Sequence, residues 1–301
     1  MTTDSAATTL LAFLEDEIGC MAAGDSLFHV IPVPWEASVS YGGGTAAGPE
    51  AILRASGQLE VWDGRSIPAE RGICTNPAID CTGDPEDILG RIQSAVGVSA
   101  RAGAVPVLLG GEHTVTLGAL RALQEIHGQF GVVQFDAHAD LRDAYQGTPL
   151  SHACVMHRAL DLGLPLFQIG VRALSPPEVA LRAERAIPHL DGPDLPLTKP
   201  EASVLPQDFP EKIYVTFDVD GLDPSLMPAT GTPVPGGLFW HQAMWLLENI
   251  VQGRTVVGFD VVELAPAPGQ HGCDFTAAQL VYSLMGFAAR ELQQQPSSSG
   301  E

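Results

Sequence analysis

The sequence predicts an α/β protein with three layers, in which a central, mostly parallel sheet has helices on both faces. Short apolar runs alternate with segments of helical periodicity along the chain. The 301 residues contain no internal repeat or long linker, and 45% of them are hydrophobic, which is enough for a large core. Several polar residues directly follow apolar runs, as ligand residues do at the carboxyl ends of parallel strands. We therefore expect a single domain over residues 1–301, with a frayed tail from about 293.

In the first half of the chain, apolar spacing and turn residues define the elements. Five apolar residues between Leu10 and Ile18 recur at helical spacing and predict a helix over 5–22. Proline in the first turn marks the next helix, which begins at Gly48. The other expected elements are strand 29–34, glycine-rich loop 41–44, helix 48–56, an edge segment over 73–79, helix 84–104, strand 106–110 and helix 114–127.

The second half of the chain continues the alternation of strands and helices. Ser175 precedes Pro-Pro-Glu and is a suitable N-cap. The span 187–210 is rich in proline and acidic residues, which indicates a surface connection with room for one short strand. The other expected elements are a strand ending at Asp136, polar loop 141–149, a helix from 151, strand 166–172, strand 213–218, helix 239–251, strand 255–261 and helix 276–292.

The charge and the cysteines restrict the class of protein. There are 36 acidic and 15 basic residues, a net charge of −21, which disfavours nucleic acid and anionic membranes as partners. No apolar run approaches the roughly 18–20 residues of a membrane span, and no basic region precedes an apolar stretch at the start, as it would in a signal peptide. The five cysteines show no C-x-x-C pairing, so we expect a reduced, cytoplasmic protein.

Candidate metal ligands follow three of the apolar runs. Asp136, His138 and Asp140 occupy alternate positions, which share one side of an extended chain. Such ligands without a thiolate are typical of Mn²⁺, with Fe²⁺, Co²⁺, Ni²⁺ or Zn²⁺ as alternatives. Six are too many for one catalytic ion and predict two, which together lower the pKa of a shared water. The six candidates are His113, Asp136, His138, Asp140, Asp218 and Asp220.

These stretches resemble the ureohydrolases, the arginase–agmatinase family of binuclear manganese enzymes, over nearly the whole chain. The resemblance implies an eight-stranded parallel sheet and hydrolysis of a guanidino group to urea and an amine. It also suggests a homo-oligomer, either a trimer or a hexamer. The matching stretches are Pro34–Tyr41, Gly48–Ile52, Gly110–His113, Phe135–Asp140, Ser151–Ala153, Phe217–Pro224, Gly231–Gly237 and Asp260–Glu263.

The resemblance also assigns roles to individual residues. Asp136 and Asp218 would bridge two Mn²⁺ ions, one completed by His113 and Asp140 and the other by His138 and Asp220. Glu263 would receive the guanidinium, whose two-pronged geometry suits a carboxylate. His152 would carry a proton to the leaving amine, although it could instead be an ordinary histidine at a helix start. The expected catalytic residues are therefore His152, Glu263 and Asp140. Glu112 and Asp223 are interpreted as structural residues, and the cysteines, including Cys154 near His152, as structural thiols.

The tail of the substrate is the least determined part of the hypothesis. Residues 172–175 lack the acidic residue with which arginases hold an amino-acid head group, so free arginine is disfavoured. Agmatine, cleaved to putrescine and urea, suits an acidic protein. Arg142 would accommodate a carboxylate tail and Asp143 an amine, so guanidinobutyrate, guanidinopropionate and guanidine stay open. A non-catalytic subunit with this fold is the alternative from another class of protein.

Overall fold

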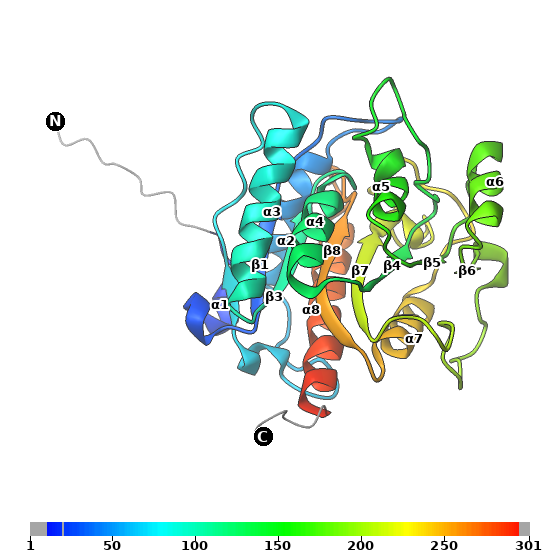
Figure 1. The fold of residues 1–301 in the computed structure, drawn as a ribbon. Coiled ribbons are helices and arrows are strands. Elements are labelled where there is room, and N and C mark those ends of the chain that lie inside the picture. Colours follow the sequence, from blue (N-terminus) through cyan, green and yellow to red (C-terminus); the bar gives the residue numbers. More distant parts are fainter. Residues whose placement is uncertain (1–10, 20, 295–301) are drawn as a thin grey trace.

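The computed structural model describes residues 11–19 and 21–294 and has one parallel sheet at its centre (Figure 1). The sheet order is β2-β1-β3-β8-β7-β4-β5-β6, and every neighbouring pair within it is parallel. The strands are β1 Phe28–Val33, β2 Ile73–Thr75, β3 Val105–Gly110, β4 Gly131–Phe135, β5 Leu166–Ile169, β6 His189–Leu190, β7 Lys212–Asp218 and β8 Thr255–Val262. The predicted fold class is confirmed, and a single sheet is consistent with one domain, which stays a prediction.

Helices cover both faces of this sheet (Figure 1). The α-helices are α1 Glu15–Ile18, α2 Gly48–Ser56, α3 Pro85–Arg101, α4 Val115–His127, α5 Val155–Asp161, α6 Pro176–Glu184, α7 Trp240–Val251 and α8 His271–Gln294. Short 3₁₀ helices occupy Ala23–Asp25, Thr45–Ala47, Pro68–Arg71, His152–Cys154, Gly192–Asp194 and Val219–Gly221. None of the helices in the described part of the chain is long and apolar enough to cross a membrane.

Two separate apolar cores hold the layers together, because each sheet face buries a different set of strand side chains. One core packs α2, α7 and α8 against the sheet, through side chains such as Ile52, Leu246 and Leu280. The other packs α3, α4 and α5 against the opposite face, through side chains such as Ile92 and Leu120. The interior strands β1 and β3 are buried along their whole length, as expected for strands covered on both sides.

The expected helix over 5–22 is wrong in its described part. Only Glu15–Ile18 is helical, because Leu14 adopts a left-handed backbone (φ 59°) and Gly19 ends the turn at φ 67°. The amide of Leu14 bonds to the Ser56 hydroxyl instead of continuing a helix. The apolar spacing here reflects insertion into the core, where Phe13 and Leu14 are fully buried. Residues 1–10 and 20 lie outside the described part.

Other element boundaries moved by a few residues. The strand expected over 166–172 ends at Ile169, because Gly170 turns the chain at φ 89°. The last helix begins at His271, five residues before the expected start, and continues through Gln294. The rest of the tail expected to fray lies outside the described residues. Ser175 caps α6 through a reciprocal capping box with Glu178, as predicted.

Candidate metal centre and substrate pocket

Four neighbouring strands bring the candidate site residues to one edge of the sheet. In the order β3-β8-β7-β4, the strand ends align so that Phe135 pairs with Phe217 and Asp218 with Val262. Asp136 directly follows β4, Asp218 ends β7 and Glu263 directly follows β8. His113 comes three residues after β3 ends. Residues that are far apart in sequence therefore meet at the carboxyl edge, where ligands bind in parallel sheets.

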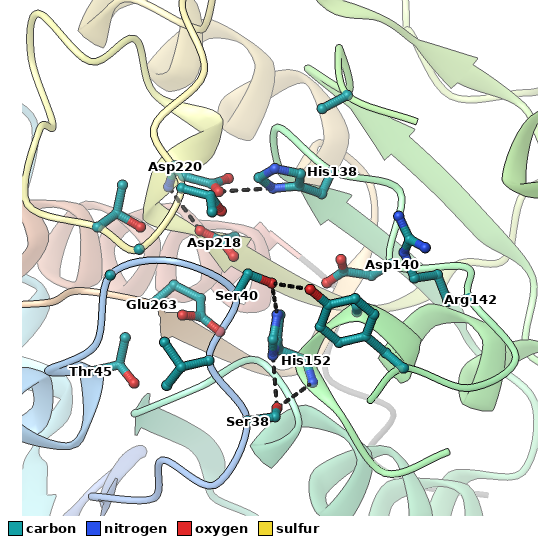
Figure 2. Close-up of a pocket in the computed structure, with 18 of the residues that line it drawn as sticks. Ser38, Ser40, Thr45, His138, Asp140, Arg142, His152, Asp218, Asp220 and Glu263 are labelled. Carbon is teal, nitrogen blue, oxygen red and sulfur yellow. Dashed lines mark hydrogen bonds and ion pairs between the residues drawn. The ribbon is translucent and has the colours of Figure 1, made fainter. Parts of the chain in front are cut away.

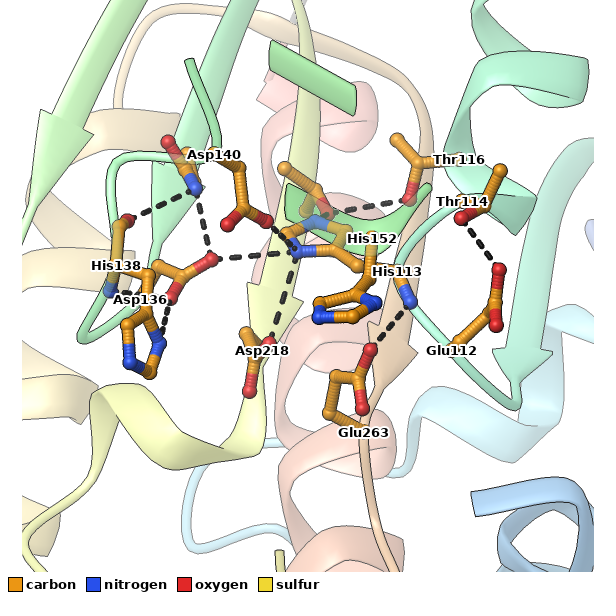
Figure 3. A network of polar contacts seen from close by, with 12 residues as sticks. Glu112, His113, Thr114, Thr116, Asp136, His138, Asp140, His152, Asp218 and Glu263 are labelled. Carbon is orange, nitrogen blue, oxygen red and sulfur yellow. Dashed lines mark hydrogen bonds and ion pairs between the residues drawn. The ribbon is translucent and has the colours of Figure 1, made fainter. Parts of the chain in front are cut away.

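His113 is the centre of the first group of ligands. Its Nδ1 lies 3.0 Å from Asp140 Oδ2, 3.2 Å from Asp136 Oδ2 and 3.6 Å from Asp218 Oδ2 (Figure 3). Nδ1 is buried, yet it makes no hydrogen bond of acceptable geometry with a protein atom. A buried polar atom without such a partner, facing three carboxylates, is what a nitrogen ligand of a cation looks like.

His138 is the centre of the second group. Its Nδ1 lies 3.0 Å from Asp220 Oδ2 and 3.6 Å from Asp136 Oδ1. Asp136 therefore belongs to both groups, as a bridging ligand would. Asp218 joins the groups from β7, since its Oδ1 accepts the amide of Asp220 at 2.8 Å while Oδ2 faces His113. The six predicted metal ligands are thus brought together.

A buried network behind His113 sets the orientation of its ring. Thr216 Oγ1 lies 2.7 Å from His113 Nε2 and donates its hydrogen to Asp260 Oδ1 at 2.6 Å. Because a hydroxyl has one hydrogen, Nε2 must be the donor to Thr216, and Nδ1 is the ring nitrogen that faces the carboxylates. Tyr214 and Thr116 also donate to Asp260, which is fully buried.

Thr216 and Asp260 were not predicted as site residues, although the sequence contains a signal for each. Thr216 precedes Asp218 by two positions on a strand, so both side chains share one side. Asp260 interrupts the apolar run of β8, and a carboxylate inside a buried strand requires partners.

The acidic groups of this edge repel one another strongly. Burial and the charge of Asp136 raise the pKa of Asp140 to about 7. Burial, together with neighbouring carboxylates, raises the pKa of Asp218 and of Glu263 well above their ordinary values. Burial disfavours a charged His113, but hydrogen bonds and charge from Asp136 and Asp140 raise its pKa well above the usual range. The site therefore attracts positive charge, which a proton or a divalent cation can supply.

Two of these residues hold unusual backbone conformations. Asp140 and Glu263 have φ values of 53° and 64°, in the left-handed region that non-glycine residues rarely adopt. Strain of this kind persists where the surrounding structure enforces it, and it is concentrated at functional sites. The amide of Glu263 donates to Gly111 O at 2.9 Å, and its Oε1 accepts the amide of His113 at 2.6 Å. These bonds fix Glu263 beside the first group of ligands.

A cavity of about 330 Å³ opens above the two groups (Figure 2), a volume within the range of small-molecule sites. Its lining combines four of the candidate ligands with Glu263, His152 and Arg142. The residues in the lining that carry charge or can titrate are His138, Asp140, Arg142, His152, Glu178, Asp218, Asp220 and Glu263, with Tyr145 beside Arg142. One concave site therefore contains most of the predicted chemistry.

His152 is held at both ring nitrogens by serine hydroxyls (Figure 2). Ser38 Oγ lies 2.7 Å from Nδ1, and Ser40 Oγ lies 2.8 Å from Nε2. Ser40 also donates to Tyr145 Oη at 3.1 Å, and the Tyr145 ring meets the imidazole edge-on. Burial lowers the pKa of His152 to about 4, with further lowering from the charges of His113 and His138. The serines and the tyrosine were not predicted as partners of His152.

The structural interpretations of Glu112 and Asp223 agree with their contacts. Glu112 Oε2 accepts the amides of Ala37 and Ser38, and Oε1 accepts the Thr114 hydroxyl. Glu112 therefore anchors the loop that contains Ser38 and Ser40. Asp223 accepts four hydrogen bonds: two are local, from the amide and hydroxyl of Ser225, and two come from the amides of Gly236 and Gly237 in a later loop.

The two candidate residues for the substrate tail are placed differently. Arg142 lines the cavity, with its guanidinium 5.3 Å from the centre of the Tyr145 ring. Asp143 does not line it, because its exposed carboxylate pairs with Arg158 at 2.9 Å. The substrate-binding role predicted for Asp143 is therefore not supported by its position. Arg172 is occupied by backbone carbonyl groups, including Asp220 O at 2.7 Å.

The residues present fit a pair of hard or borderline divalent cations. The donor set contains oxygen and nitrogen without sulfur, and it forms two groups that share Asp136: His113 with Asp140, and His138 with Asp220. The unpartnered His113 Nδ1 and the raised carboxyl pKa values both indicate a place for positive charge. Fold and site together therefore define an α/β protein with two adjoining carboxylate–imidazole groups at the carboxyl edge of its sheet, each of which could hold a metal ion.

The chain belongs to the arginase family, whose model matches residues 26–286. It is 38% identical to an N(1)-aminopropylagmatine ureohydrolase of Synechocystis sp. over 290 residues, covering 91% of this chain and 93% of that protein. It is 32% identical to an agmatinase of Pyrococcus horikoshii, covering 88% and 93%. The solved agmatine ureohydrolase of Thermoplasma volcanium superposes with a TM-score of 0.83 at 27% identity, covering 96% of this chain and 98% of that one. The predicted family is confirmed.

Proposed function

We propose that this protein hydrolyses the guanidino group of an amine-tailed substrate of the agmatine class, releasing urea and an amine. The observation that supports this most directly is the convergence of six ligand residues on one buried edge, where His113 Nδ1 has no hydrogen-bond partner. Glu263 and His152 line the same cavity as four of these residues. Because the chain belongs to the arginase family, the expected reaction is hydrolysis of an amidine C–N bond.

The six ligand residues would hold two Mn²⁺ ions; Asp136 belongs to both groups of residues, and Asp218 lies beside His113 and the amide of Asp220. When bound, such a pair lowers the pKa of water and supplies hydroxide at neutral pH. Glu263 binds the guanidinium, because its half-buried carboxylate lines the cavity beside the ligands and a guanidinium pairs with it through two parallel hydrogen bonds. His152 delivers a proton to the leaving nitrogen. Asp140, the third expected catalytic residue, would act as a metal ligand beside His113, 3.0 Å from its Nδ1.

The names of the relatives suggest two amine-tailed substrates. Agmatine would yield putrescine, and relatives named agmatinase support it. Several of the relatives with higher identity are named N(1)-aminopropylagmatine ureohydrolase, which makes a longer polyamine tail the second candidate. The carboxylates of the cavity favour a cationic substrate, whereas Arg142 is the one feature of the lining that favours guanidinobutyrate or guanidinopropionate.

We further propose a cytoplasmic homo-oligomer, a trimer or a hexamer, that takes small guanidino substrates. Within the part of the chain that the structure describes, Cys81, Cys154 and Cys273 are free thiols, which is compatible with a reducing compartment. Size-exclusion chromatography with light scattering tests the oligomeric state. A monomer with full activity would refute this part of the proposal.

The decisive experiment is urea release by the Mn²⁺-loaded protein with agmatine, N(1)-aminopropylagmatine, arginine, guanidinobutyrate, guanidinopropionate and guanidine. The series is repeated with Ni²⁺. Dominant turnover of either amine-tailed compound supports the proposal, and dominant turnover of a guanidino acid contradicts the assigned tail. Metal analysis is the companion measurement. If the wild type held no metal after purification with Mn²⁺, the enzyme hypothesis would fail in favour of a non-catalytic subunit. If Asp136→Ala kept full activity, the role of Asp136 as a metal ligand would be refuted.

A further inference from the structure

The contacts of His152 leave its imidazole without a free nitrogen. Nδ1 lies 2.7 Å from Ser38 Oγ and Nε2 lies 2.8 Å from Ser40 Oγ. A general acid must reach its acceptor directly or through one intervening group. Of the two hydroxyls, Ser38 is buried, and it also accepts the amide of His152 and the Ser151 hydroxyl. Ser40 is exposed and lines the substrate cavity.

The direction of the hydrogen bonds is suited to transfer through Ser40. Ser40 Oγ donates its single hydrogen to Tyr145 Oη, so its lone pairs receive the Nε2–H of His152. Tyr145 is half-buried in the cavity wall beside Arg142, where it can hold the Ser40 hydrogen until a better acceptor arrives. A leaving nitrogen with a free lone pair is such an acceptor.

The loop that contains both serines is held rigidly. Glu112 accepts the amides of Ala37 and Ser38, which fixes the start of the loop. Glu36 accepts the amide and the hydroxyl of Thr45, which fixes its end. Ser40 therefore occupies a defined place in the cavity wall, as a group that transfers a proton must.

We propose that Ser40 is a catalytic residue that passes the proton of His152 to the leaving amine. In this step the Ser40 O–H bond breaks as the N–H bond of the leaving amine forms. The Nε2–H bond breaks as a new Ser40 O–H bond forms, and the C–N bond of the substrate breaks. Because its lowered pKa leaves His152 neutral at rest, the imidazolium forms when His152 takes up the proton lost by the attacking water. It becomes neutral imidazole again as that positive charge leaves on the ammonium product. Ser38 has a separate role and holds the ring from the Nδ1 side. This inference rests on the proposed function and on the role given there to His152.

The test compares Ser40→Ala with Ser38→Ala in the full, Mn²⁺-loaded protein. Both variants remove one hydroxyl from one nitrogen of the same ring, so Ser38→Ala is the matched control for ring positioning. Urea release is measured with agmatine and with guanidines whose leaving amines are progressively less basic. We expect Ser40→Ala to lower kcat for agmatine about 100-fold with little change in KM, a typical loss of general-acid assistance.

Two readouts separate proton transfer from ring positioning. The loss in Ser40→Ala should shrink as the leaving amine becomes less basic, because a weakly basic amine leaves without a proton, whereas any loss in Ser38→Ala should be uniform across the series. Ser40→Thr, which keeps the hydroxyl, should restore most of the rate. Ser40→Ala with wild-type kcat, or with the same leaving-group dependence as Ser38→Ala, would overturn the role of Ser40 alone. A wild type that released no urea from any guanidino compound would overturn the proposed function together with it.

Discussion

The Thr216 hydroxyl offers a direct test of how this fold prepares a metal ligand. Thr216→Val keeps the shape of the side chain and removes the one group that accepts the Nε2–H of His113, at 2.7 Å. The same change takes one donor from Asp260. Because His113 and Asp260 are fully buried, water cannot easily replace the lost partner.

The size of the effect follows from that burial. A buried donor without an acceptor costs about 1–3 kcal/mol. Loss of a group that orients a ligand lowers metal affinity by about 10- to 100-fold. We expect Thr216→Val to weaken binding of the Mn²⁺ at the His113 group within this range, because the ring can then rotate and Nδ1 is no longer aimed at Asp136 and Asp140.

Thr116→Val is the matched control. Thr116 donates to the same Asp260 carboxylate at 2.7 Å, and its hydroxyl lies 3.5 Å from that of Thr216. Titration calorimetry with Mn²⁺, after removal of metal by a chelator, gives the affinity of each variant. Unfolding in urea gives their stabilities. Equal Mn²⁺ affinities for the two variants, at equal stability, would refute the idea that Thr216 orients His113.

Three further predictions concern stability, pH and metal stoichiometry. Gly111→Ala places a methyl group 2.0 Å from a backbone oxygen and should lower the free energy of unfolding in urea by about 3 kcal/mol. Gly90→Ala, which adds a methyl group in open space on a helix, should raise it by roughly 0.5–1 kcal/mol. Equal unfolding midpoints for the two variants would contradict this. Because the pKa of His152 is lowered to about 4, this residue contributes stability that is present above pH 6.5 and lost as the pH falls from 6.5 to 4. His152→Asn should therefore show a smaller fall in Tm over that range than the wild type. Parallel curves of Tm against pH for the two proteins would exclude this contribution. By elemental analysis, Asp220→Asn should hold one Mn²⁺ per chain and Asp223→Asn should hold two, since only Asp220 faces His138. Identical Mn²⁺ contents in the two variants would disprove the assignment of Asp220 as a ligand.

The site residues were predictable because their positions follow from local geometry. Asp136, His138 and Asp140 alternate after a strand, and such a pattern places side chains on one side wherever the strand lies. His113, Asp218 and Glu263 each follow an apolar run, and the carboxyl ends of parallel strands share one edge. Neither rule depends on the order of strands in the sheet, so both can be applied to the sequence alone.

Other features depended on contacts between segments that the sequence does not connect. The apolar spacing before Ile18 indicated a helix, but Phe13 and Leu14 enter the core instead, and the amide of Leu14 bonds to Ser56, 42 residues away. Asp143 follows the ligand strand closely, yet Arg158 draws its carboxylate away from the cavity. Neither outcome can be read from local spacing, because each is decided by a partner distant in the chain.

The sequence by itself determined the α/β class, the carboxyl edge at which the candidate site residues lie and their chemical types, since alternation and strand ends are properties of single segments. Only the tertiary structure decided how these groups are tuned. Thr216 and Asp260 orient His113 across two strands, and Ser38 and Ser40 reach His152 from a loop more than 110 residues away. Hydrogen bonds form between atoms within about 3 Å of each other, and such proximity is set by the packing of the whole chain.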